Sequence, residues 1–204
     1  MKIKKIQLLL AGAFTLFTAT ALNGQVPAKP DKATENMTTK DFKDEVGDVQ
    51  WRSVNDGVMG GLSKGSSYLT EAGNRIFRGE ISLRNNGGFS SIRTFGGEYN
   101  LSAYEGVIVK VRGDGRKYYF TSRANNRSRV AFWAPIQTKA GEWTTHKIPF
   151  STFYATSFGR KLRGLKLNSE NITSFGLMLY DKNDGEFNIE VESIKVYGKK
   201  SNPK

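Results

Sequence analysis

The sequence predicts an all-β protein in which two antiparallel sheets pack face to face as a sandwich of the jelly-roll type. About ten short segments alternate apolar and polar residues with a period of two, and they are rich in β-branched and aromatic residues. Turn-forming residues separate these segments at short intervals. Beyond the N-terminus, no stretch of ten or more residues carries a helical apolar stripe. These observations favour a sandwich over a repeat array or an α/β fold.

The expected strands follow one another along the whole chain after its N-terminal segment. They cover residues 49–54, 66–70, 75–83, 89–94, 107–111, 117–121, 130–133, 143–148, 172–180 and 187–197. Turns rich in glycine, asparagine and aspartate lie between them, at 71–74, 112–116, 139–142 and 181–186. The spacing is that of consecutive antiparallel strands.

The last expected strand, 187–197, shows the alternation most clearly. Its apolar positions change phase once near Ser193, which is what a β-bulge produces. Glu190 and Glu192 fall between apolar positions and are therefore expected to face solvent. The expected inward residues are Phe187, Ile189, Val191, Ile194 and Val196.

The two ends of the chain differ in composition from the rest. Lysines precede an apolar run that ends near Ala21, which is typical of a secretory signal at 1–21. The run is short and interrupted for a membrane span, so we expect cleavage over retention as an anchor and no stable span afterwards. A polar, proline-containing flexible linker is expected at 22–45, the folded domain at 46–198 and a polar tail at 199–204. We therefore expect an exported protein, periplasmic or secreted.

Charge and cysteine content limit the classes of function. The formal net charge is +12, and it falls to +9 without the three lysines of the signal segment, so the surface favours acidic partners. There is no cysteine, so the domain must be stabilised by burial and strand pairing. With no cysteine and only His146, Cys/His nucleophilic sites and multi-histidine metal sites are excluded.

Two glycine- and asparagine-rich turns, within 51–63 and 83–93, are the most specific features of the sequence. Their glycines allow close approach of another backbone, and their polar side chains are suited to recognition. Arg93 is the expected polar anchor and Met59 the apolar one. The alternative, a packed loop that closes one end of the sandwich, stays open. The candidate binding residues here are Asn55, Asp56, Met59, Gly60, Gly61, Ser63, Asn85, Asn86 and Arg93.

A second candidate region interleaves basic and aromatic residues between 112 and 133, and it contributes Arg116, Tyr118 and Trp133 to the expected binding residues. Aromatic rings beside cations suit the stacking of sugars or single-stranded nucleic acid. Nucleic acid is not expected as a partner of an exported protein. Carbohydrate remains a possible ligand.

Signals for catalysis are weak. The sequence has no Gly-x-Ser-x-Gly elbow, and the neighbours of His146 look structural. Asp56 and Asp181, the candidate carboxylates for a hydrolase, lie in turns where aspartate is favoured for local hydrogen bonding. The stretch that begins at Asp181 departs from a calcium loop at its fifth and sixth positions. We expect no catalytic residue, no metal site and no cofactor.

Several motifs together resemble one known family over residues 46–197. They are Trp51 with Asn55-Asp-Gly-Val-Met-Gly-Gly-x-Ser63, Leu83-x-Asn-Asn-Gly-Gly-Phe-x-Ser-x-Arg93, Gly115-Arg-x-Tyr118, Trp143 with Ile148-Pro-Phe150 and Phe153, Phe158-x-Arg160, and Ser174-x-Gly-Leu-Met178 followed by Asp181-Lys and Gly185-x-Phe187. The chain is similar to the complex I intermediate-associated protein family. The resemblance implies a galactose-binding-like jelly roll, and it implies relatives that assemble respiratory complex I in mitochondria by binding proteins, without known catalysis. The N-terminus departs from that pattern, because it looks like a bacterial export signal.

The expected function is therefore a non-catalytic binding or assembly module of the cell envelope that acts through protein–protein contacts. The alternative is a carbohydrate-binding module of the periplasm or exterior, with Tyr118, Trp133 and Trp143 as stacking groups.

Overall fold

The computed structural model describes residues 40–41, 50–125 and 129–198. The expected signal segment (1–21) and polar tail (199–204) lie outside the described residues, as does all of the expected linker (22–45) except Lys40 and Asp41. The described residues form two antiparallel sheets joined by short turns, so the predicted all-β sandwich is confirmed. Within these ranges no helix has the length and apolar character needed to cross a membrane.

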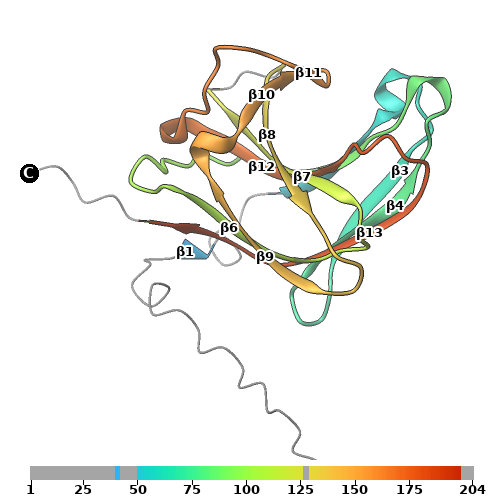
Figure 1. Cartoon of the computed structure of the whole chain (residues 1–204), viewed down its shortest axis with the longest axis horizontal. Coiled ribbons are helices and arrows are strands. Elements are labelled where there is room, and N and C mark those ends of the chain that lie inside the picture. The colour runs from blue at the N-terminus through green and yellow to red at the C-terminus, as the bar shows by residue number, and fades with distance from the viewer. Residues whose placement is uncertain (1–39, 42–49, 126–128, 199–204) are drawn as a thin grey trace, which may run out of the picture. The chain divides into compact units, whose positions relative to one another are not determined.

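The first sheet has six strands. Its order is β3 (Lys64–Leu69), β4 (Arg75–Ile81), β13 (Gly185–Tyr197), β6 (Gly106–Arg112) and β9 (Trp143–Pro149), with β1 (Lys40–Asp41) also paired to β13. The β1 pairing differs from the expectation of a linker at this point, because the backbone of two polar residues meets β13 at Val196 and Lys195. Figure 1 shows this sheet as one layer of the sandwich.

The second sheet has seven strands and carries the site described below. Its order is β11 (Arg160–Lys161), β10 (Tyr154–Ser157), β8 (Ala131–Gln137), β7 (Lys117–Ala124), β12 (Ile172–Leu179), β5 (Ser90–Phe95) and β2 (Gln50–Asn55). Four 3-10 turns lie between strands, η2 (Asp56–Met59), η3 (Arg84–Asn86), η4 (Phe150–Thr152) and η5 (Ser169–Asn171). Strands adjacent in space, such as β5 and β12, are far apart in sequence.

The expected bulge in the last strand is confirmed. The register of β13 against β6 shifts between Val191 and Ser193, where the apolar alternation changes phase. Glu190 corrects the expectation of a solvent-facing side chain, since only 8% of the residue is exposed. The amide of Asn74 donates to Glu190 at 2.7 Å and Arg112 pairs with it, so its two oxygens are covered by partners.

The core lies between the two sheets. Its largest fully buried side chains include Phe77, Phe120 and Leu177, none of which is measurably exposed. The rings of Phe120 and Phe175 stack with centroids 5.6 Å apart, and Phe77 meets Phe187 edge to face at 4.7 Å. Burial of each such side chain contributes about 1.5–3 kcal/mol, so the core can stabilise a domain without disulfides.

All ten expected strands are present, whereas β10 and β11 were not predicted. Only six residues take part in these two strands, too few to show a period. Their turn contains Phe158 and Gly159, both with positive φ. This hairpin brings Phe158 to the outer face of the second sheet, where the candidate site lies.

Candidate binding site

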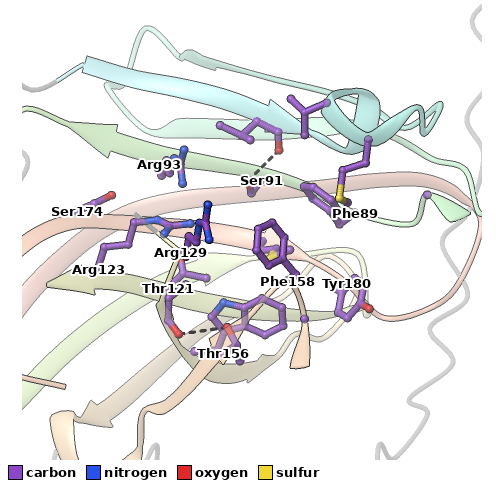
Figure 2. Close-up of a pocket in the computed structure, with 18 of the residues that line it drawn as sticks. Phe89, Ser91, Arg93, Thr121, Arg123, Arg129, Thr156, Phe158, Ser174 and Tyr180 are labelled. Atoms are coloured by element: carbon purple, nitrogen blue, oxygen red, sulfur yellow. Dashed lines mark hydrogen bonds between the residues drawn. The ribbon is translucent and has the colours of Figure 1, made fainter. Parts of the chain in front are cut away.

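A cavity of about 530 Å³ opens on the face of the second sheet that points away from the core. Strand alternation places its lining, because the core positions Ile92 and Leu177 are followed along the chain by Arg93 and Met178 on the opposite face. The lining comes from β2, β5, β12, β7, β8 and β10 and from the two glycine-rich turns. Figure 2 shows these side chains together.

Gly176 lies on β12 between the lining residues Ser174 and Met178, on the same face of the strand. It pairs with Arg93 on β5 and with Thr121 on β7. A Cβ atom at this position would lie 2.4 Å from the carbonyl oxygen of Ile92 and 2.9 Å from the Cβ of Arg93. Neighbouring atoms of β5 and β7 therefore occupy the position that a side chain would take, so only glycine fits here without a shift.

One half of the cavity is cationic. Figure 2 shows the nitrogen-bearing ends of Arg93, Arg123 and Arg129 gathered there. Burial lowers the pKa of Arg93, and burial together with the charge of Arg93 lowers the pKa of Arg123 to about 10. The Nε atom of Arg93 is buried and has no hydrogen-bond partner among the described residues. Lys182 adds a fourth positive side chain to the lining.

The other half is apolar. Phe89, Phe158 and Tyr180 lie on this side in Figure 2. Val58, Met59 and Phe158 form its exposed rim, with 77%, 56% and 78% of their surfaces accessible. Phe158 has φ of 47°, a conformation that a bulky side chain seldom adopts. The rim therefore presents apolar groups to solvent at some conformational cost.

Asp56 joins the two glycine-rich turns from behind. It is fully buried, and its carboxylate accepts hydrogen bonds from the amide and hydroxyl of Ser63 and from the amides of Gly88 and Phe89. Burial alone would raise the pKa of Asp56, but these hydrogen bonds outweigh burial and hold the pKa below its ordinary value. Gly61 passes so close that a Cβ there would lie 2.4 Å from the Asp56 Cγ atom.

The three asparagines of these turns shape the loops. Asn55 donates to the carbonyl of Gly65 at 3.2 Å and accepts from the hydroxyl of Ser90 at 2.6 Å. Asn85 donates to the carbonyl of Gly60 at 3.2 Å, which ties one turn to the other. Asn85 and Asn86 have φ of 55° and 57°, in the left-handed region that asparagine tolerates.

The structure divides the predicted site residues into two groups. Met59, Asn86, Arg93 and Trp133 line the cavity. The remaining residues are Asn55, Asp56, Gly60, Gly61, Ser63, Asn85, Arg116 and Tyr118, and they do not line it. Most of these stabilise the loops or the sandwich. In the glycine-rich turns, some residues therefore line the cavity, whereas others pack within the loop that closes this end of the sandwich.

Arg116 and Tyr118, at the start of β7, form hydrogen bonds within the fold. Arg116 forms a two-pronged ion pair with Asp181, at 2.7 and 2.9 Å, and also donates to the carbonyl groups of residues 183, 185 and 186. The hydrogen bond with Asp181 is the main cause of a raised pKa of Arg116. Tyr118 is fully buried and donates to Asp114 at 2.8 Å. Both side chains are therefore occupied within the fold.

Trp133 is enclosed by other rings. Tyr119, Tyr154 and Tyr180 surround it with centroid distances of 5.1, 6.5 and 5.7 Å, and only 6% of Trp133 is exposed. Flat stacking of a ligand needs an open ring face. Trp133 therefore forms part of the wall and offers no stacking platform.

The cavity is suited to binding and holds no acid–base pair. Among the described residues, its lining contains no histidine, aspartate or glutamate. His146 lies on β9 in the first sheet, 2.9 Å from the Thr144 hydroxyl, and burial lowers its pKa. The described part of the chain has no group of three side chains able to hold a metal ion.

Sequence reasoning did not select Phe158, Arg123, Arg129, Met178, Tyr180 and Lys182 as site residues, although all line the cavity. Arg123 had a usable signal, since it alternates with the core positions Tyr118 and Phe120 and so lies on the outer face of β7. Phe158 belongs to a motif of the family resemblance, Phe158-x-Arg160, but the hairpin that carries it was not predicted, so its position on this face could not be inferred.

Comparison with known proteins identifies similar chains. The family model described as Complex I intermediate-associated protein 30 matches residues 40–191. The probable complex I intermediate-associated protein 30, mitochondrial, of Caenorhabditis briggsae is 32% identical over 158 residues, which cover 67% of this chain and 46% of that protein. The corresponding mitochondrial protein of Drosophila melanogaster is 29% identical over 172 residues, covering 71% and 57%. The chain thus spans about half the length of these curated relatives.

The expected location, periplasmic or secreted, is wrong on this comparison. The curated relatives are named as mitochondrial proteins. A short apolar run that follows lysines does not by itself identify the compartment to which the chain is targeted. The cell-envelope setting of the expected function is corrected for the same reason.

Solved structures with the same architecture include a carbohydrate-binding module and an agarase, but their identity to this chain is low. The family 11 carbohydrate-binding module of the cellulase Lic26A-Cel5E of Clostridium thermocellum is 18% identical, with a TM-score of 0.59 over 82% of this chain and 98% of that one. An agarase, AgWH50C, is 8% identical, with a TM-score of 0.51 over 75% and 23%. These likenesses show the galactose-binding-like jelly roll alone.

Proposed function

The chain belongs to the Complex I intermediate-associated protein 30 family, and we propose from this premise that it is a non-catalytic binding protein acting in complex I assembly. In this proposal a partner protein docks at the cavity of the second sheet. One observation carries it: exposed Val58, Met59 and Phe158 form the rim of the apolar half of a cavity whose other half is positively charged. Exposed apolar groups around a recess are typical of protein-binding surfaces.

The composition of the rim supports a protein as the partner. Methionine, aromatic residues and arginine are the types enriched at the cores of protein interfaces, and the cavity combines Met59, Phe158 and Arg93. The two glycine-rich turns are fixed from behind by Asp56, so one side of the rim is pre-organised and loses little freedom on binding.

Carbohydrate binding has less support. The similar carbohydrate-binding modules share the fold at 18% identity or less among the structures compared above. The expected stacking residues do not face the cavity with open rings: Tyr118 is fully buried, Trp133 is 6% exposed, and Trp143 lies on the first sheet between Lys110 and Arg112. We therefore keep protein binding as the proposed function.

The test is crosslinking of the tagged full chain in its native cells, followed by identification of the recovered proteins. A Met59→Ser/Phe158→Asn variant removes the apolar rim. The matched control is Tyr68→Asn/Leu69→Ser on the edge strand β3, which removes two apolar groups that are 42% and 59% exposed on the other sheet.

Recovery of complex I subunits with the unaltered chain and the control, and their loss with the rim variant, is the expected result. Circular dichroism and urea denaturation must first show that both variants fold. Equal recovery with the rim variant, or no complex I subunit with the unaltered chain, would overturn the proposal.

A further inference from the structure

The cationic half of the cavity has an excess of positive charge with no acidic residue in its lining. Arg93, Arg123 and Arg129 contribute to it, and no carboxylate lines the cavity in the described ranges.

Arg93 is the centre of this cluster. It lies directly opposite Arg52 in the β2–β5 register, and its charge is one cause of the lowered pKa of Arg123. Like charges opposite one another on strands are unfavourable. Arg93 is thus surrounded by cations, while its buried Nε–H group makes no hydrogen bond in the described part of the chain. A buried donor without a partner indicates a place where a ligand can supply one.

Both arginines are held in place by their surroundings. The guanidinium group of Arg93 lies over the ring of Phe95, 4.8 Å from its centroid. That of Arg123 donates to the carbonyl of Val130 at 3.3 Å. Arg93 and Arg123 both line the cavity, from strands β5 and β7 that flank β12, so the two groups can approach the same ligand from adjacent sides. Planar guanidinium groups bind oxyanions through paired N–H donors.

We infer that Arg93 and Arg123 form an oxyanion-binding site, and that it takes a carboxylate carried on an apolar body. The apolar half of the cavity, with Phe89, Phe158 and Tyr180, lies beside the arginines in Figure 2 and would contact that body. A volume of about 530 Å³ is sufficient for a charged group together with its neighbours.

The inference deepens the proposed function and rests on it for the source of the carboxylate, which is an acidic side chain of the docked partner protein. An acidic segment flanked by apolar residues matches both halves of the cavity. The anion site itself can be measured without the partner, which separates the two claims.

The first experiment titrates the isotope-labelled full chain with sodium benzoate, a carboxylate on an apolar ring, and follows the Nε–Hε signal of Arg93 by NMR. Benzamide is the neutral probe of the same shape, and sodium chloride at equal ionic strength controls for screening. Inorganic phosphate tests a free anion without an apolar body. Saturable binding of benzoate, weaker binding of phosphate and none of benzamide are expected.

Variants test the residues. Arg93→Gln and Arg123→Gln are each expected to weaken benzoate binding about tenfold, because each removes charge-assisted hydrogen bonds. Arg93→Lys keeps the charge but not the paired donors, and should also bind more weakly than the unaltered chain. Arg52→Gln is the matched control, since it removes the same charge from the position opposite Arg93 without altering the cavity lining; it should weaken benzoate binding less than Arg93→Gln or Arg123→Gln.

The outcomes separate the inference from the proposed function. No saturable benzoate shift, an equal response to benzamide, or equal weakening by Arg52→Gln overturns the anion site, even where complex I subunits are still recovered through the rim. Tighter binding of phosphate than of benzoate overturns the apolar-body part and favours a free anion. If benzoate binding depends on Arg93 but the Arg93→Gln variant recovers the partner proteins as well as the unaltered chain does, the partner is not the source of the carboxylate.

Discussion

Gly88 donates its backbone amide to the buried carboxylate of Asp56, with a nitrogen-to-Oδ2 distance of 2.6 Å across 32 residues of sequence. The same carboxylate accepts from the amide of Ser63 at 2.9 Å. One negative charge therefore fixes the relative position of two turns that form part of the cavity. Several consequences for stability can be measured directly.

Asp56→Asn is expected to destabilise the protein by about 2–4 kcal/mol. The amide group of asparagine would direct donors at the N–H and O–H donors of Ser63, Gly88 and Phe89, which now share a carboxylate. Urea denaturation followed by tryptophan fluorescence measures the change. Glu142→Gln, at an exposed ion pair, is the control and should change stability by less than about 0.5 kcal/mol. Equal stability of Asp56→Asn and the unaltered chain would contradict the role of the carboxylate.

Stability is expected to fall in acid because the pKa of Asp56 is lower in the folded protein than its ordinary value of 3.8. The unfolded chain then binds a proton more readily, so the contribution of Asp56 is complete above about pH 5 and is lost as pH falls below about 4 through the folded pKa. Asp181 and Glu190, whose pKa values are also lowered, act in the same direction. Urea midpoints measured from pH 7 to pH 3 should fall less steeply in Asp56→Asn. Parallel curves would show that Asp56 does not contribute.

Gly61→Ala is expected to destabilise the protein by about 1–3 kcal/mol through steric overlap. Its Cβ atom would lie 2.4 Å from Cγ of Asp56, whereas a Cβ at Gly57 would have no atom within 4 Å. Gly57→Ala is therefore the matched control in the same turn and should be neutral or stabilising by about 0.5 kcal/mol. Thermal unfolding of both variants provides the comparison. A larger loss for Gly57→Ala than for Gly61→Ala would be inconsistent with this packing.

Phe158→Asn is expected to raise the free energy of unfolding by about 0.5–1 kcal/mol, because asparagine tolerates the left-handed conformation of this position. Phe158 is 78% exposed, so little packing is lost. Phe158→Ala removes the ring but keeps a residue that disfavours positive φ, and it should show no gain. Chemical denaturation distinguishes the two. A stability gain of the same size for alanine would point to the ring, not the backbone, as the source of strain.

The fold could be predicted because the alternation of apolar and polar residues that marks a strand lies within that strand. In β13 the positions of Phe187, Ile189 and Val191, and the phase change before Ile194, follow from the sequence and agree with their burial. The β10–β11 hairpin was missed because two strands of four and two residues carry no measurable period. Glu190 has the expected alternation but is covered by Asn74, in the turn before β4, and by Arg112 of β6.

The site could be predicted only in part because it depends on contacts between distant segments. Arg93, Met59 and Asn86 were found through their unusual sequence context, and they line the cavity. Asp56 has the same local context whether its carboxylate faces solvent or the amides of a turn about thirty residues away. Arg93 and Arg123 lie on the same part of the sheet because β12 pairs with both β5 and β7. No local sequence pattern indicates this strand order.

The buried carboxylate also separates what holds the first glycine-rich turn from what that turn displays. Asp56 faces inward, whereas Val58 and Met59, two and three residues later, lie on the solvent side with most of their surface accessible. Substitutions at Val58 or Met59 change the surface that a binding partner contacts, and they leave the hydrogen bonds of Asp56 intact. Proteins that share this fold can therefore bind different molecules while the loop at this end of the sandwich stays packed in the same way.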